Sequence, residues 1–181
     1  MEQNCMSDIV VIINGKPRSG KDTFCKYVEE WAENLGKDCS TWSTIDMEKE
    51  VLEELLGREY DPDGEWSSTD REFLSKFKQL LNECYDYTFD TFKTSLEFIG
   101  GIQLIHSREW EEIDRMREYC HDKGIRFVTV YLSSSFEKNY NNDSDYLCDT
   151  NIEDYDYYIS NIKGLEELKK YARDFCDKEL L

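Results

Sequence analysis

The chain has 181 residues, of which 39% are hydrophobic and 14% aromatic, and it carries a formal net charge of −18. The length suits a single domain over residues 1–181, and the charge disfavours nucleic-acid polymers and anionic membranes as partners. The longest apolar run, residues 9–13, is too short to cross a bilayer. Seven scattered cysteines without a CxxC pair favour reduced thiols in the cytoplasm over a disulfide framework or a zinc site.

A glycine-bounded loop follows this apolar run, which has the composition of a buried strand. Gly15 to Lys21 match the pattern GxxxxGK, and a helical pattern begins directly afterwards. Glycine allows backbone conformations that a β-carbon forbids, and the backbone N–H groups of such a loop point at an anion near the positive end of the helix. The sequence therefore predicts a phosphate-binding loop. Its candidate residues are Gly15, Lys16, Pro17, Arg18, Ser19, Gly20, Lys21, Asp22 and Thr23.

Three side chains of the loop have candidate roles in chemistry. Lys21 supplies a cation for the β and γ phosphates of a nucleotide. Asp22 stands where the pattern usually has Ser or Thr, and with Thr23 it offers the oxygen ligands that Mg²⁺ prefers. Asp22 is equally explained as an acid favoured in the first helical turn by the helix dipole. Arg18 either reaches a transferring phosphate or lies in solvent.

The remainder of the chain alternates predicted strands and helices. Apolar residues recur at helical spacing between the strands and after the last one. Strands that alternate with helices imply a parallel sheet covered on both faces, which is an α/β fold. The predicted strands are residues 9–13, 38–45, 99–106, 126–132 and 155–160.

The segment between the second and third strands is predicted to be helical around a turn at residues 61–64. Thr69 to Glu72 read as a capping box that opens a helix. The apolar face of this helix is predicted to include Phe73, Phe77 and Leu80, which places Lys78 on the opposite, solvated face. Further along the chain, Ser107 is the predicted cap of the helix that ends at Gly124.

Three motifs resemble those of two related groups of enzymes. They are the core Arg18-Ser19-Gly20-Lys21-Asp22, the pair Ser107-Arg108, and residues 158–161 followed by 164–168. They are similar to the loop, the Asp-Thr-Arg or Asp-Val-Arg motif and the last strand and helix of the deoxynucleoside monophosphate kinases of bacterial viruses. The animal-type phosphomevalonate kinases share the same loop. The motifs occur in the same order along nearly the whole chain, whereas residues 46–98 match only in character.

This resemblance implies a nucleoside-monophosphate-kinase-like P-loop NTPase fold with a five-stranded parallel sheet. It implies an acceptor-binding helical insert at residues 46–98 and a lid-like segment at 133–155. In such enzymes MgATP gives its γ-phosphoryl group to a small phosphorylated acceptor, here most simply a nucleoside or deoxynucleoside monophosphate. ATP and Mg²⁺ are therefore the expected cofactors, and small nucleotides the expected partners. The oligomeric state is left open, a homodimer included.

The resemblance also assigns roles to individual cations. Lys21, Arg18 and Arg108 are the candidate catalytic residues, and Arg71 and Arg108 the candidate acceptor-binding residues. Arg108 follows a predicted central strand at the carboxyl edge of the sheet, where open α/β sheets bind ligands. The alternatives are a surface ion pair for Arg108 and a solvated helix face for Arg71. Lys78, on the same helix as Arg71, is a weaker candidate.

Two departures from the family pattern favour a rival function. His106 stands where these enzymes have an acid that organises magnesium, so either Asp22 or another acid substitutes or catalysis is weakened. A buried, hydrogen-bonded core histidine is the alternative reading of His106. The lid-like segment holds no arginine and one lysine, Lys138. The rival is a catalytically degenerate P-loop nucleotide-binding module with a sensing or partner-binding role.

Overall fold

The computed structural model of the protein describes residues 7–57, 67–135 and 151–181. Five parallel strands form one sheet in the order β2-β3-β1-β4-β5. The strands are β1 (Ser7–Asn14), β2 (Cys39–Ser43), β3 (Gly101–His106), β4 (Arg126–Ser134) and β5 (Tyr157–Asn161). The described helices are α1 (Lys21–Asn34), α2 (Asp46–Leu56), α3 (Ser68–Tyr85), α4 (Tyr87–Phe98), α5 (Trp110–Lys123) and α7 (Leu165–Glu179), with a 3₁₀ turn at Ile152–Asp154.

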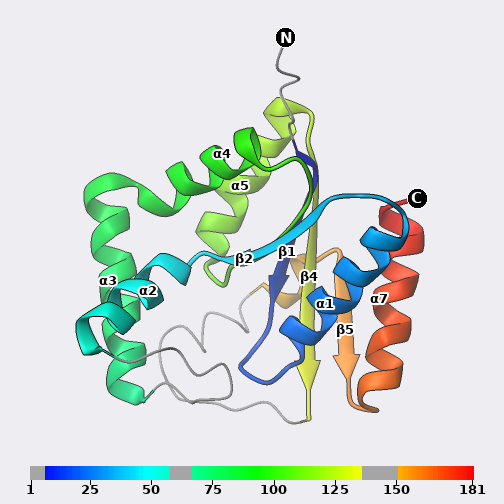
Figure 1. Cartoon of the computed structure of the whole chain (residues 1–181), viewed down its shortest axis with the longest axis horizontal. Coiled ribbons are helices and arrows are strands. Elements are labelled where there is room, and N and C mark those ends of the chain that lie inside the picture. The colour runs from blue at the N-terminus through cyan, green and yellow to red at the C-terminus, as the bar shows by residue number, and fades with distance from the viewer. Residues whose placement is uncertain (1–6, 58–66, 136–150) are drawn as a thin grey trace.

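Strand β1 lies at the centre of the sheet and is covered on both faces (Figure 1). Its side chains alternate between the faces, as in any strand. Ile9, Val11 and Ile13 belong to a core shared with α1 and α7, whereas Val10 and Ile12 belong to a second core shared with α4 and α5. The apolar run predicted as a buried strand is therefore confirmed, and so is the α/β fold with helices on both faces.

All five predicted strands are present, with boundaries that shift by a few residues. The third was predicted to begin at Ile99 but begins at Gly101, whose φ is +76°. A β-carbon on Gly101 would lie 2.3 Å from the backbone oxygen of Asp38, so the strand passes too close to the chain before β2 for any other residue. Ile102 N–H donates to the same oxygen at 2.8 Å, which pins this start of β3.

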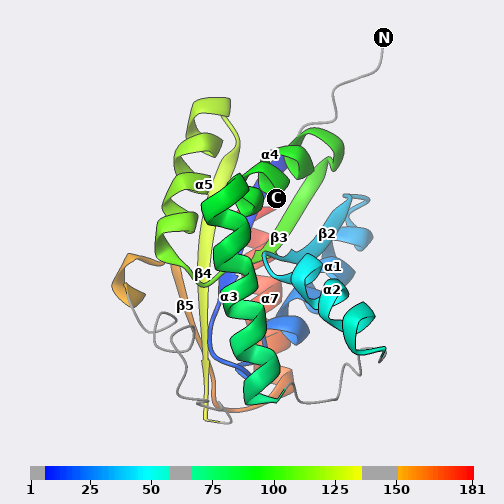
Figure 2. The ribbon, with the colours of Figure 1, turned by 90° about the vertical axis from the view of Figure 1, so that its left-hand side faces the viewer.

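Helices α2, α3 and α4 lie between β2 and β3 in the chain. Figure 2 shows α3 in front of the sheet with α5 on one side and α2 on the other. Asp86, with φ 52°, separates α3 from α4. The turn predicted at residues 61–64 and most of the lid-like segment 133–155 lie outside the described residues.

The predicted apolar face of α3 is wrong. The side chains that α3 buries are Asp70, Leu74 and Lys78, whereas Leu80 is 55% exposed. Helical periodicity assumes that the largest apolar side chains face the core. Here the facing surface offers the half-buried carboxylates of Glu109 and Glu112 instead, so α3 turns Lys78 toward them.

The predicted caps of two helices also need correction. Helix α3 opens on a capping box between Ser67 and Asp70, and not between Thr69 and Glu72. Helix α5 begins later than predicted, and its N-cap is Glu109. Ser107 is buried in the link that precedes it. Both shifts are of two residues, because several polar residues precede each helix and local pattern does not choose between them.

Two further observations concern membrane-spanning helices and disulfides in the described residues. In residues 7–57, 67–135 and 151–181, no helix is both long and apolar enough to cross a membrane. The described cysteines, which are Cys25, Cys39, Cys84, Cys120 and Cys176, are free thiols.

A pair of leucine substitutions tests this placement of the core. Leu104 in β3 is fully buried, whereas Leu55 in α2 is 69% exposed. We expect Leu104→Ala to lower the free energy of unfolding by about 3 kcal/mol, because it leaves a cavity in the core. Leu55→Ala should change it by less than about 0.5 kcal/mol. Urea denaturation measures both, and a Leu55→Ala loss as large as that of Leu104→Ala would contradict the packing of α2.

Candidate functional site

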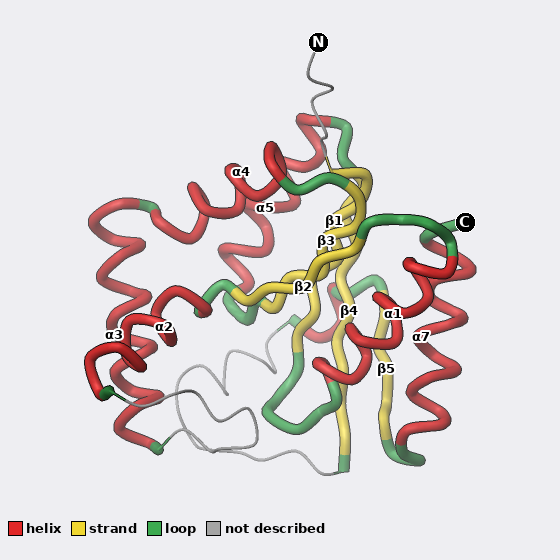
Figure 3. The backbone as a smooth tube through the Cα atoms, viewed as in Figure 1, coloured by secondary structure: helices red, strands yellow, loops and turns green. Residues whose placement is uncertain are grey.

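The loop between β1 and α1 lies at the carboxyl edge of the sheet (Figure 3). It depends on two glycines with positive φ, Gly15 at 143° and Gly20 at 99°. A β-carbon on Gly15 would lie 2.2 Å from the backbone oxygen of Leu132, and one on Gly20 would lie 2.7 Å from Asn161 Nδ2. The glycines are therefore required where the loop passes the ends of β4 and β5.

Lys21 begins α1 and folds back over the loop. Its Nζ donates to the backbone oxygen of Gly15 at 2.7 Å and to that of Lys16 at 2.8 Å. The ammonium is thus held against the loop backbone at the N-terminus of a helix, where the helix dipole and the loop amides favour an anion. Arg18 lies in the same loop, exposed and with φ 66°.

Two buried asparagines at strand ends hold the loop in place. Asn14 ends β1; its Oδ1 accepts from Gly15 N–H at 2.6 Å, and its Nδ2 donates to the Tyr155 hydroxyl at 2.6 Å. Asn161 ends β5, and its Nδ2 donates to the backbone oxygen of Ser19 at 3.2 Å. The sequence analysis assigned neither residue a role. The available signal was that each is a polar residue at the carboxyl end of a predicted strand.

His106 at the end of β3 contacts the first turns of α1. Its Nε2 lies 3.2 Å from Cys25 Sγ, and its Nδ1 lies 3.6 Å from Asp22 Oδ1. Burial lowers the pKa of His106 to about 4, with Asp22 opposing the shift and Lys21 adding to it. Burial also raises the pKa of the Cys25 thiol. Near pH 7 both groups are neutral, so His106 is a hydrogen-bonded histidine with only 16% of its side chain exposed, and the Cys25 thiol is not activated as a nucleophile.

Asp22 and Thr23 present oxygen atoms beside Lys21, and the Asp22 side chain is 95% exposed. Mg²⁺ commonly takes one or two protein oxygens and completes its shell with water and substrate phosphates. This donor set fits a magnesium ion shared with a bound nucleotide. No group of three or more His, Cys, Asp or Glu side chains in the described parts of the chain is placed to hold a metal by itself.

The remaining candidate cations come from other elements. Arg108 lies in the link between β3 and α5 at the same edge as the loop, and Arg71 lies in the first turn of α3. Lys49 of α2, which sequence reasoning missed, bonds Asp46 at 2.8 Å and is close enough to lower the pKa of His106. Lys78 was predicted to be solvated, and that is wrong: it is bound to Glu109 and Glu112 with only 7% of its side chain exposed.

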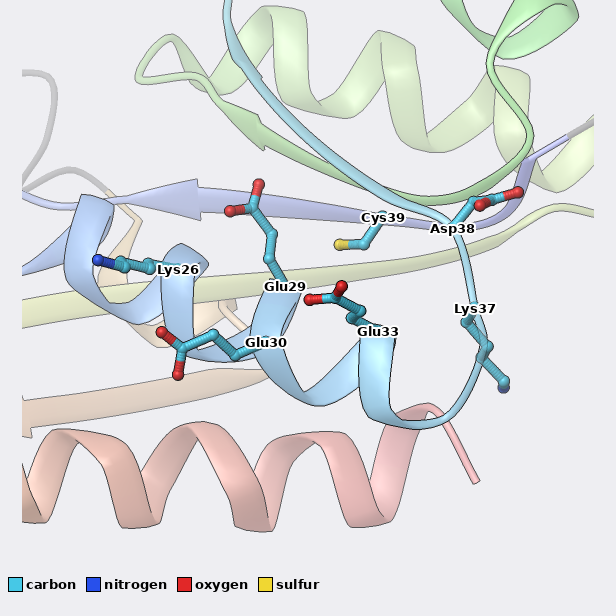
Figure 4. A pocket seen from close by; sticks show the side chains of 7 residues that line it. All are labelled: Lys26, Glu29, Glu30, Glu33, Lys37, Asp38 and Cys39. Atoms are coloured by element: carbon cyan, nitrogen blue, oxygen red, sulfur yellow. The ribbon is translucent and has the colours of Figure 1, made fainter.

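A separate hollow of about 480 Å³ lies beside the later turns of α1 and the start of β2 (Figure 4). Its lining consists of Lys26, Glu29, Glu30, Glu33, Lys37, Asp38 and Cys39. Acidic side chains outnumber the lysines, which disfavours phosphate binding. Burial raises the pKa of the Cys39 thiol to about 12, so this thiol is unreactive near neutral pH. The hollow is not a second nucleotide site.

Comparison with models of known protein families finds no match, and comparison with curated proteins finds none. Solved structures do match. A protein of Chloroflexus aurantiacus provisionally assigned as a kinase aligns over 95% of this chain and 97% of its own, with a TM-score of 0.53 and 14% identity. The fold is that of the P-loop kinases.

A further similar structure is the APS kinase of Mycobacterium tuberculosis. It aligns over 96% of this chain and 99% of its own, with a TM-score of 0.49 and 18% identity. A second structure of that enzyme, in complex with AMPPNP and APS, aligns over 95% of this chain and 97% of its own, with a TM-score of 0.48 and 16% identity. At these identities the comparisons establish the fold alone.

The buried His106 predicts an acid-sensitive fold. The unfolded state takes up a proton below about pH 6.5, whereas the folded state resists protonation until about pH 4, so stability falls as the pH is lowered through this window. The difference is on the order of 2–3 kcal/mol. Denaturation without nucleotide or magnesium should show a smaller loss across this window for His106→Gln.

His121→Gln is the matched control, because that side chain is 89% exposed. It should keep the pH dependence of the wild type. The assignment of the effect to His106 is refuted when His106→Gln retains the full wild-type slope between pH 4 and 6.5.

Proposed function

We propose that this protein transfers the γ-phosphoryl group of MgATP to a small phosphorylated acceptor, namely a nucleoside or deoxynucleoside monophosphate. The observation that carries the proposal is the loop from Gly15 to Thr23. It combines two obligatory glycines, a lysine held over the loop backbone and a helix N-terminus at the carboxyl edge of a parallel sheet. These are the features that a chain needs to bind the phosphates of a nucleotide.

In the proposed reaction an oxygen of the acceptor phosphate forms a bond to the γ-phosphorus. The bond from that phosphorus to the β–γ bridging oxygen breaks, and ADP leaves with that oxygen. Such a transfer needs mainly positioning and neutralisation of charge. Lys21 exchanges its bonds to the Gly15 and Lys16 oxygens for the β and γ phosphates, while Arg108 and Arg71 bind the acceptor phosphate and Arg18 lies near the transferred group.

Asp22 and Thr23 are the residues that would hold the magnesium ion of the donor. The ion supplies positive charge to the phosphate oxygens. His106 keeps its Nδ1 towards Asp22, because a protonated Cys25 thiol donates to Nε2 and leaves the ring proton on Nδ1. In this proposal the neutral imidazole lies beside the carboxylate, at a distance longer than a hydrogen bond, and does not itself bind the metal.

A binding module without turnover is the second candidate function. It is favoured by His106, an imidazole at the strand end where the deoxynucleoside monophosphate kinases that the sequence resembles have an acid. It is also favoured by Lys78, whose ammonium is paired with two carboxylates. Such a module retains the loop and binds nucleotide, but transfers no phosphate. Neither observation weakens the expectation of nucleotide binding.

The experiment is an incubation of the purified protein with MgATP and a panel of acceptors, followed by ³¹P NMR. The panel contains the ribo- and deoxynucleoside monophosphates and phosphomevalonate. We expect one nucleoside monophosphate to be converted to its diphosphate. Lys21→Met should reduce that rate at least about a hundredfold, because it removes the cation nearest the transferred phosphate.

Lys26→Met is the matched control, since Lys26 lies on the same helix but is exposed beside the acidic hollow. It should leave the rate unchanged. Product that persists in Lys21→Met would indicate a contaminating kinase. Absence of product from every acceptor, with MgATP still bound, would reject the kinase and leave the binding module.

A further inference from the structure

Helix α3 buries a lysine whose hydrogen-bonding capacity is fully used. Lys78 Nζ lies 2.7 Å from Glu109 Oε2, 2.8 Å from Glu112 Oε2 and 3.2 Å from Thr44 Oγ1. An ammonium has three N–H donors, and these three bonds occupy all of them. Lys78 therefore has no donor left for a phosphate, and its function must be exerted through the groups that it binds.

These groups come from several elements of the fold. Thr44 follows β2, while Glu109 and Glu112 lie at the N-terminal end of α5. Asn82, one turn beyond Lys78, donates from Nδ2 to Glu112 Oε1 at 2.8 Å, and its Oδ1 accepts from Thr88 N–H in α4 at 2.9 Å. We call Thr44, Lys78, Asn82, Glu109 and Glu112 the lysine cluster. It joins the end of β2, α3, α4 and α5 around one ammonium.

The lysine cluster encloses the link that carries Arg108. On the β3 side, Thr44 N–H donates to the backbone oxygen of His106 at 3.0 Å. On the α5 side, Glu109 directly follows Arg108 and bonds Lys78. Arg108 thus lies between two points that the same cluster fixes. Because Arg71 lies on the same helix as Lys78, the cluster also sets the position of Arg71 relative to Arg108.

The charges of the cluster depend on one another. Burial alone would lower the pKa of Lys78, but Glu109 and Glu112 outweigh it and raise that pKa. Burial likewise opposes ionisation of Glu109, and Lys78 outweighs it and lowers the pKa of Glu109. Burial raises the pKa of Glu112 to about 7. Loss of Lys78 would take from both carboxylates the ammonium that they bond, and would leave Glu109 with the weaker influence of Arg108.

Stability alone gives little reason for such a cluster. Apolar side chains of similar volume often stabilise a buried contact as well as an ion pair does, whereas charged bonds specify one geometry. Helix α3 carries large apolar side chains at Phe73 and Leu80, yet these are 37% and 55% exposed. The chain places its directional, charged bonds toward the link and leaves these two apolar side chains outward, while Leu74 is buried beside them.

We propose that Lys78 is a positioning residue of the phosphoryl-transfer site. With Glu109 and Glu112 it docks α3 onto the start of α5, and so holds Arg71 and Arg108 as one rigid pair of cations facing the phosphate-binding loop. This inference rests on the proposed function, because it takes the two arginines as the groups that bind the acceptor phosphate.

Two variants separate positioning from stability. Lys78→Met removes the ammonium, and the triple variant Lys78→Met/Glu109→Gln/Glu112→Gln also removes the charges of the two carboxylates that bond it. We expect Lys78→Met to lower Tm and the triple variant to recover it. In both folded variants the KM for the acceptor should rise on the order of ten- to a hundredfold, because the arginines are displaced. The Kd for MgADP, measured by calorimetry, should stay within about twofold.

The inference is overturned when the triple variant recovers the acceptor KM together with Tm, since Lys78 would then be merely structural. It is also overturned when the affinity for MgADP falls as much as that for the acceptor. If Lys78→Met does not fold, the triple variant alone decides between these outcomes.

A second readout needs no turnover. The Nε–Hε resonance of Arg108, assigned with Arg108→Lys, is followed by NMR while inorganic phosphate is added to the MgADP-bound protein. We expect the resonance to shift in the wild type, and to need about tenfold more phosphate in the triple variant. An unresponsive wild-type Arg108, or equal responses in both proteins, overturns the inference. If the Arg108 result holds while no acceptor is phosphorylated, the kinase proposal fails and the positioning of Arg108 stands.

Discussion

The structure depends on the position of β1, which is hydrogen-bonded on one side to β3 and on the other to β4. Both faces of this strand are also covered, so the chain that leaves it must turn back over the carboxyl edge of the sheet. The turn passes close to Leu132 at the end of β4 and Asn161 at the end of β5, at distances that admit no β-carbon on Gly15 or Gly20. The loop that we propose to bind phosphate therefore takes its path from the central position of β1.

The other groups of the site reach the loop because all strands are parallel. Their carboxyl ends lie together, so His106 of β3 is level with Ile13 of β1 and Ser43 of β2. This arrangement brings the imidazole against the first turns of α1, where it meets Asp22 and Cys25. Polar side chains at three strand ends therefore contact the loop or α1, namely Asn14 of β1, His106 of β3 and Asn161 of β5.

The parts of the structure that the sequence predicted are those encoded locally. The apolar run of β1 and the glycine and lysine spacing of the loop lie within 13 consecutive residues, 9–21, and both were read correctly. The orientation of α3 was not, because it depends on residues distant in the chain. Lys78 bonds Glu109 and Glu112, which are 31 and 34 residues away, and a hydrophobic pattern contains no information about such partners.

The chemistry of His106 shows the same limit. The sequence identified the residue as a departure from the pattern of the similar kinases, but left open what its imidazole contacts. Its partner Cys25 is 81 residues away. Only the packing of β3 against α1 reveals that the ring is buried and neutral. Likewise, the roles of Asn14 and Asn161 follow from the backbone that they meet and not from their neighbours in sequence.

The most direct test of the account is an NMR titration of the ¹⁵N-labelled protein with MgADP. We expect the backbone amide resonances of residues 15, 16 and 18–23 to shift together, with that of Gly15 among them as phosphate competes with Asn14 for its N–H. We expect smaller changes for residues that line the hollow beside α1, such as Glu30 and Asp38. Saturable binding that shifts the hollow and leaves the loop amides unchanged would contradict the account.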